Sequence, residues 1–255
     1  MADIIYQTVY HTFASIISHT RFLFCSIISM SSPSTGAELN DYITSVVHHV
    51  DAALKTCGDS QFNGKTGLNE AGFQAMFATV MTIIRPPFGG KAVFEAPIGD
   101  SFIADIMIIF DEESALAPCL IELKYIRLGF LEAPDPMSEF NRIPGGPRNI
   151  NTRTEILRRL RLQTQAACVD RNVFRSWKVL QKFDGQAATV TTVETIQTNA
   201  MDQVRKYART LVSDTDRRHH VYAIVGVGNT IVDPFHALMT VRAKIPMSQL
   251  KLKPR

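Results

Sequence analysis

The sequence predicts an α/β fold in which a mixed central sheet is flanked by helices. Segments with helical and strand periodicity follow one another in the order α, α, β, β, β, loop, α, α, β, which suits helices on both faces of one sheet. The 255 residues, 45% hydrophobic and 20% charged, can bury a sizeable core. No internal repeat divides them. We therefore expect a single domain over residues 35–255, preceded by a poorly ordered extension, residues 1–34.

The N-terminal extension lacks the pattern of a membrane or secretory segment. Its apolar run, residues 22–30, is far shorter than the roughly 20 residues that span a bilayer. No basic segment precedes that run, as a secretory signal requires. A transit peptide, or an extension foreign to a working protein that starts at Met30, both remain open. We expect an intracellular protein that does not bind membranes.

The cysteines also indicate an intracellular protein. None of the four belongs to a C-x-x-C pair, which indicates neither a zinc site nor a disulfide framework. A reducing compartment is the expected setting. They are Cys25, Cys57, Cys119 and Cys168.

Two helices are predicted to open the domain. Thr35-Gly-Ala-Glu38 fits a capping box, and apolar residues recur at helical spacing from there to Leu54. The second helix covers about residues 69–84 and ends at Arg85-Pro86-Pro87, because proline cannot continue a helix.

Three strands follow that are joined by short connections, which indicates an antiparallel meander. Four prolines and two glycines then predict a loop at 132–152. Beyond it come an Arg-rich helix, a second helix and a buried strand. The strands are expected at 92–98, 102–110 and 120–128, the helices around 153–161 and at 199–212, the buried strand at 220–227, and one further strand within 229–241.

Charged side chains stand where a core would not place them. Glu122 and Lys124 point the same way from a buried strand, because strand side chains alternate between faces. Asp105 is one carboxylate among the eight apolar residues of F-I-A-D-I-M-I-I-F. Glu70 lies only about 20° around its helix from the apolar Phe77. These positions suggest that the carboxylates meet.

Carboxylates that converge in a core repel one another and need a partner. Mg²⁺ suits a few carboxylates completed by water. A cation held by Asp105 and Glu122 would polarise a phosphate oxygen and lower the pKa of a bound water. Lys124 would orient that water or stabilise the developing charge.

Asp105 followed by Glu122-Leu123-Lys124 resembles the D…E-x-K signature of the PD-(D/E)XK nuclease superfamily. Gln203 and Tyr207, four residues apart on a predicted helix, resemble the Q-x-x-x-Y motif of its RecB-like branch. The resemblance covers about residues 69–228. The chain departs from the pattern at Ala104, where the family has Pro, and at Phe102, where the branch has Gly.

The resemblance implies a restriction-endonuclease-like α-β-β-β-α-β core and a nuclease that uses Mg²⁺, with Mn²⁺ as a substitute. Asp105 and Glu122 would bind the cation together with the Leu123 carbonyl, and Glu70 would support the site. Gln203 and Tyr207 would line the cleft that faces DNA.

Basic residues predict a phosphate-rich partner. Arg158 and Arg159 belong to a cluster within 148–161, and Arg205 belongs to a second cluster within 205–218. We expect these three residues to contact the backbone of a nucleic acid, with DNA as the substrate and a nuclear location as an option.

Structural interpretations stay open beside this one. Glu122 and Lys124 would form an ion pair on an edge strand, Glu70 would favour the helix dipole, and the arginines would be a solvated helix face. Glu95, on the opposite side of its strand from Phe94, is expected to be exposed. The alternative function is a catalytically inactive nuclease-fold protein that binds DNA or acts as an effector.

Overall fold

The computed structural model describes residues 36–56, 68–99, 101–111, 116–127, 130–132, 171–181, 189–211 and 218–240. The chain divides into two compact units, Met1–Pro33 and Ser34–Arg255, and every described residue belongs to the second. The predicted N-terminal extension and the Arg-rich helix around 153–161 lie outside the described residues, as does the predicted loop at 132–152 except for Glu132, which is a strand residue. None of the helices within the described ranges combines the length and apolar character that a bilayer span requires.

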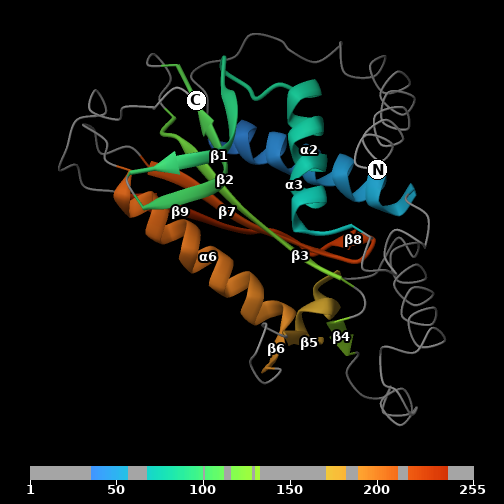
Figure 1. The fold of residues 1–255 in the computed structure, drawn as a ribbon. Coiled ribbons are helices and arrows are strands. Elements are labelled where there is room, and N and C mark those ends of the chain that lie inside the picture. The colour runs from blue at the N-terminus through green and yellow to red at the C-terminus, as the bar shows by residue number, and fades with distance from the viewer. Residues whose placement is uncertain are drawn as a thin grey trace, which may run out of the picture. The chain divides into compact units, whose positions relative to one another are not determined.

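A mixed sheet carries the fold, as predicted from the sequence (Figure 1). Its strand order is β1-β2-β3-β7-β8, with β9 also paired to β7. The first three strands form the predicted antiparallel meander, and β3 pairs with β7 in parallel. The strands are β1 (Lys91–Ile98), β2 (Phe102–Ile109), β3 (Cys119–Ile126), β7 (Arg218–Val227), β8 (Thr230–Ile231) and β9 (Phe235–Thr240).

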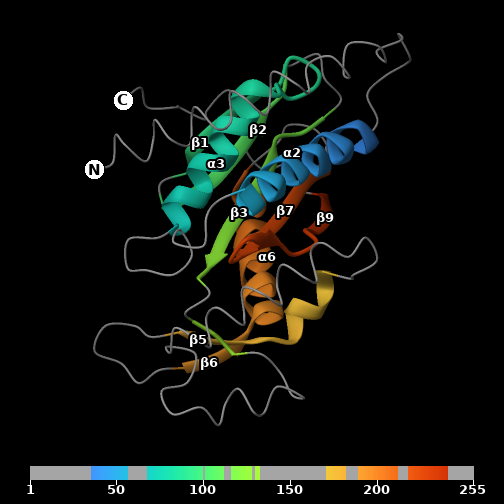
Figure 2. The ribbon, with the colours of Figure 1, turned by 90° about the vertical axis from the view of Figure 1, so that its right-hand side faces the viewer.

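Helices cover both faces of this sheet (Figures 1 and 2). On β7, Val221 and Ala223 pack in one core cluster with the helix α6 (Val193–Thr210). The alternate residues face the other side, because successive strand side chains point to opposite faces. There Tyr222 donates to Asn40 of α2 (Gly36–Thr56), and Gly226 lies against α3 (Glu70–Ile83).

Close packing brings α3 onto the sheet beside the charged strand residues. A Cβ added to Gly226 would lie 2.8 Å from two ring atoms of Phe73 and 2.9 Å from the ring of Tyr125. Only glycine therefore lets the Phe73 ring lie against β7. Phe73 and Phe77 of α3 are fully buried, and their rings meet edge to face. The contact of Phe73 with Gly226 and Tyr125 determines where the first turn of α3 stands relative to β3.

A second sheet was not predicted from the sequence. It has the order β4-β5-β6 and is antiparallel throughout. The strands are β4 (Leu131–Glu132), β5 (Lys178–Gln181) and β6 (Thr189–Thr192), and the 3₁₀ helix η4 (Arg171–Ser176) precedes β5. Runs of two to four residues are too short to show a period of two, so their periodicity was not visible.

Candidate functional site

The site lies where β2 and β3 part. Their pairing ends at Ile106 opposite Ile121, so the next residues along, Asp105 and Glu122, stand opposite each other just past the last paired residues. The Leu123 amide donates to Asp105 Oδ2 at 2.7 Å. A side-chain carboxylate thus takes the place of a main-chain acceptor. The N–H and C=O of one strand residue point toward the same neighbour, so the Leu123 carbonyl also points toward Asp105.

Gln74 of α3 holds the other oxygen of Asp105. Its Nε2 donates to Asp105 Oδ1 at 2.8 Å. Neutral donors thus orient both carboxylate oxygens and leave further lone pairs for a ligand. Gln74 was not among the site residues predicted from the sequence. The available signal was its spacing, because Gln74 follows Glu70 by four residues and therefore shares its helix face.

Gln74→Met is expected to weaken divalent-cation binding about tenfold, the lower end of what loss of a ligand's hydrogen-bond partner costs. Methionine matches glutamine in length and helix propensity but donates no hydrogen bond to Asp105. Calorimetric titration with Mn²⁺ measures the affinity, and the far-ultraviolet circular dichroism spectrum checks the fold. Wild-type affinity in a folded Gln74→Met variant would show that the Leu123 amide suffices to orient Asp105.

Lys124 joins two of the predicted acids. Its Nζ lies 3.0 Å from Glu122 Oε1 on the same strand and 3.1 Å from Glu70 Oε1 on α3. Lys124 is 27% exposed, Glu70 is 44% exposed, and Glu122 is 1% exposed. The ammonium therefore bridges a fully buried carboxylate and a carboxylate at the surface. Glu70, Asp105, Glu122 and Lys124, which the sequence placed on three elements, come together.

Burial raises the pKa of Glu122 to about 7, and the negative charge of Asp105 adds to this rise. Lys124 opposes the rise without cancelling it. Glu122 Oε2 is buried and has no hydrogen-bond partner among the described residues. A buried carboxylate oxygen without a partner carries a large desolvation cost, which a cation would offset.

The neighbouring charges shift two further pKa values upward. Burial raises the pKa of Asp105, although the Leu123 amide and Lys124 counteract it. For Lys124, burial acts to lower the pKa, but the carboxylates of Glu122 and Glu70 outweigh it, and the pKa is raised. The lysine therefore stays protonated at neutral pH, whereas Glu122 changes protonation there.

Within the described ranges, no three His, Cys, Asp or Glu side chains form a group that holds a metal ion by themselves. Glu70 is turned to Lys124 instead. The candidate ligands for a cation are the carboxylates of Asp105 and Glu122 and the carbonyl of Leu123. Mg²⁺ commonly takes one or two carboxylates and completes its six positions with water, so this set fits a hydrated Mg²⁺.

The predicted pair on α6 belongs to the same region. Gln203 Nε2 donates to the Tyr207 hydroxyl, which confirms that the two share a helix face. Burial raises the pKa of Tyr207, and the charges of Glu122 and Asp105 contribute. Tyr207 is buried in the core cluster, with its ring centroid 5.3 Å from that of Phe102.

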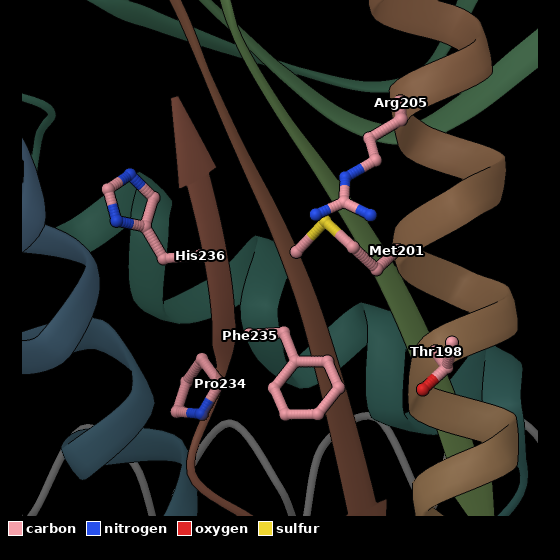
Figure 3. A pocket seen from close by; sticks show the side chains of 6 residues that line it. All are labelled: Thr198, Met201, Arg205, Pro234, Phe235 and His236. Carbon is pink, nitrogen blue, oxygen red and sulfur yellow. The ribbon is translucent and has the colours of Figure 1, made fainter. Parts of the chain in front are cut away.

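The structure does not bring the predicted Arg205 to these acids. Arg205 is two residues from Gln203, a rotation of about 200° that puts it on the opposite side of α6. There it pairs with Asp202 and lines a pocket of about 240 Å³ between α6 and β9 (Figure 3). Figure 3 shows Thr198, Met201 and Arg205 of α6 facing Phe235, while the His236 ring points away. Arg158 and Arg159 lie outside the described residues.

Comparison with known proteins adds no relative. No protein-family model matches the chain, and neither the curated proteins nor the solved structures include a match. The resemblance to PD-(D/E)XK nucleases therefore depends on the residues and geometry described above.

Proposed function

We propose that this protein is a divalent-cation-dependent nuclease that hydrolyses the phosphodiester bonds of DNA. One observation carries the proposal: Asp105 and Glu122 stand opposite each other where two strands part, and the buried Glu122 Oε2 lacks a partner. Such an arrangement is costly for stability and suits a cation. The PD-(D/E)XK resemblance supplies the class of reaction.

In this proposal, the residues around the site have separate roles. Asp105, Glu122 and the Leu123 carbonyl would hold Mg²⁺ or Mn²⁺. When bound, the cation supplies a Lewis acid that polarises the phosphate and acidifies a water molecule. Lys124, a partly exposed ammonium on the same strand, orients the attacking water and stabilises charge that develops on the phosphate. Glu70 holds Lys124 in place from α3.

Positive charge beside the site supports a nucleic-acid substrate. The Lys206 ammonium lies 4.8 Å from the ring centroid of Phe102, whose ring also contacts Tyr207. Arg209 is exposed three residues further along α6. Lys and Arg next to a phosphate-hydrolysing site contribute salt-dependent, sequence-independent affinity for the backbone. We infer that α6 lies along the path of the substrate strand.

The test compares wild type with Asp105→Asn on plasmid DNA, linear DNA and a matched RNA, in Mg²⁺, in Mn²⁺ and in EDTA. We expect wild type to cleave DNA with either cation and not in EDTA, and Asp105→Asn to lose the activity. Calorimetric titration with Mn²⁺ should show binding by wild type alone. Cation binding and DNA binding without cleavage would favour the inactive nucleic-acid-binding alternative. No cation binding by wild type would contradict the proposal.

A further inference from the structure

Glu95 of β1 has a backbone conformation that is unusual for a strand. Its φ is +47°, in the left-handed region that favours glycine. The strand on either side is regular, because Phe94 pairs with Ile106 and Ala96 pairs with Ala104. Counting inward from both pairs places Glu95 opposite Asp105.

A side chain in this region costs free energy that the surrounding structure must offset, and such residues cluster at functional sites. The other non-glycine residue with positive φ among the described ranges is Phe88, at +60°. Phe88 belongs to the turn before β1, directly ahead of Gly89, where positive φ is common. Glu95 is in the middle of a strand, where no turn requires this conformation.

The charge of Glu95 reaches the site. It is exposed, and its negative charge contributes to raising the pKa of Asp105. Glu95, Asp105 and Glu122 therefore occupy one level of three adjacent strands, and Glu70 adds a fourth carboxyl group from α3. Lys124 forms ion pairs with two of these four, Glu122 and Glu70. The partnerless Oε2 of the buried Glu122 shows that Lys124 does not satisfy the cluster.

We propose that Glu95 is a positioning residue of the cation site. Its carboxylate holds water molecules of a hydrated divalent cation beside Asp105. This inference rests on the proposed function. Mg²⁺ retains several of its waters in proteins, and an exposed carboxylate next to a ligand is placed to accept their hydrogen bonds. The strained backbone keeps the carboxylate at the level of Asp105 on the edge strand, on the side of Asp105 away from Glu122.

The experiment uses three variants of the full chain. Glu95→Gln removes the charge and keeps the length of the side chain. Glu95→Gly removes the side chain and relieves the positive φ. Glu194→Gln, an exposed glutamate nine residues before Gln203 on α6, controls for the loss of one negative charge. Mn²⁺ affinity is measured by calorimetry without DNA, and the melting temperature is measured in EDTA.

We expect both Glu95 variants to bind Mn²⁺ about tenfold more weakly than wild type, while Glu194→Gln binds normally. In EDTA, Glu95→Gly should melt about 2–4 °C higher than wild type, because glycine adopts this φ without strain. A role confined to backbone structure would shift the melting temperature and leave the affinity unchanged.

Wild-type Mn²⁺ affinity in Glu95→Gln would overturn the inference, and it would leave the proposed function intact if Asp105→Asn still lost binding. Absence of Mn²⁺ binding by wild type itself would overturn both. Glu95→Gln retains the wild-type size, so it keeps the test valid if Glu95→Gly does not fold.

Discussion

Glu122→Gln is expected to abolish cation binding and yet stabilise the metal-free protein. Glu122 is fully buried, with one oxygen on Lys124 and the other without a partner. Glutamine keeps the shape of the side chain and removes the buried carboxyl group. The raised pKa of Glu122 shows that the ionised form of this group is disfavoured in the folded protein. Its neutral carboxamide is a far weaker ligand for Mg²⁺ or Mn²⁺ than a carboxylate.

The gain in stability should depend on pH. The pKa of Glu122 is about 7 in the folded protein against an ordinary value of 4.5, so between these values the folded state binds more protons than the unfolded chain. The contribution of Glu122 to stability is thus fully present below pH 4.5 and is lost as pH rises to about 7. At about 1.4 kcal/mol per pH unit, the loss approaches about 3 kcal/mol.

Thermal unfolding in EDTA at pH 5, 6, 7 and 8 measures this effect. The melting temperature of Glu122→Gln should exceed that of wild type by a margin that grows steadily up to pH 7 and stays constant above it. Glu194→Gln controls for a glutamate-to-glutamine change at the surface. A difference between Glu122→Gln and wild type that stays constant with pH would contradict the raised pKa.

Lys124→Met is expected to lower the single-turnover rate of cleavage by about 10²–10³-fold, the usual loss when one group that stabilises transition-state charge is removed. The variant should bind Mn²⁺ at least as tightly as wild type, because the ammonium 3.0 Å from Glu122 repels a cation. Opposite effects on cleavage and cation binding would separate a role in chemistry from a role in folding.

Lys206→Met provides the contrast for Lys124→Met. Lys206 lies over the ring of Phe102, which precedes Asp105 by three residues on β2. We expect weaker DNA binding, with a smaller salt dependence, and a single-turnover rate at saturating DNA close to wild type. Equal rates for Lys124→Met and wild type would remove Lys124 from the mechanism.

Sequence periodicity predicted α2, α3, the three-stranded meander and β7 within a few residues. It placed the start of α6 at residue 199, whereas the helix begins at Val193. The missed signal was Thr192, whose side chain caps the helix by accepting the Thr195 amide. The first turns of α6 do carry a buried apolar stripe at helical spacing, Val193, Ile196 and Ala200, but the five residues between them are polar.

The sequence by itself determined which side chains share an element face: Glu122 with Lys124 on a strand, Glu70 with Gln74 and Gln203 with Tyr207 on helices. These relations are local, because they follow from residue spacing within one element. Only the tertiary structure decided that β2 leaves β3 at Asp105, that Glu122 is buried without a partner for Oε2, and that Glu95 takes a positive φ beside Asp105. Those features depend on packing between segments far apart in the chain, and burial, with the pKa shift it causes, exists only after that packing has formed.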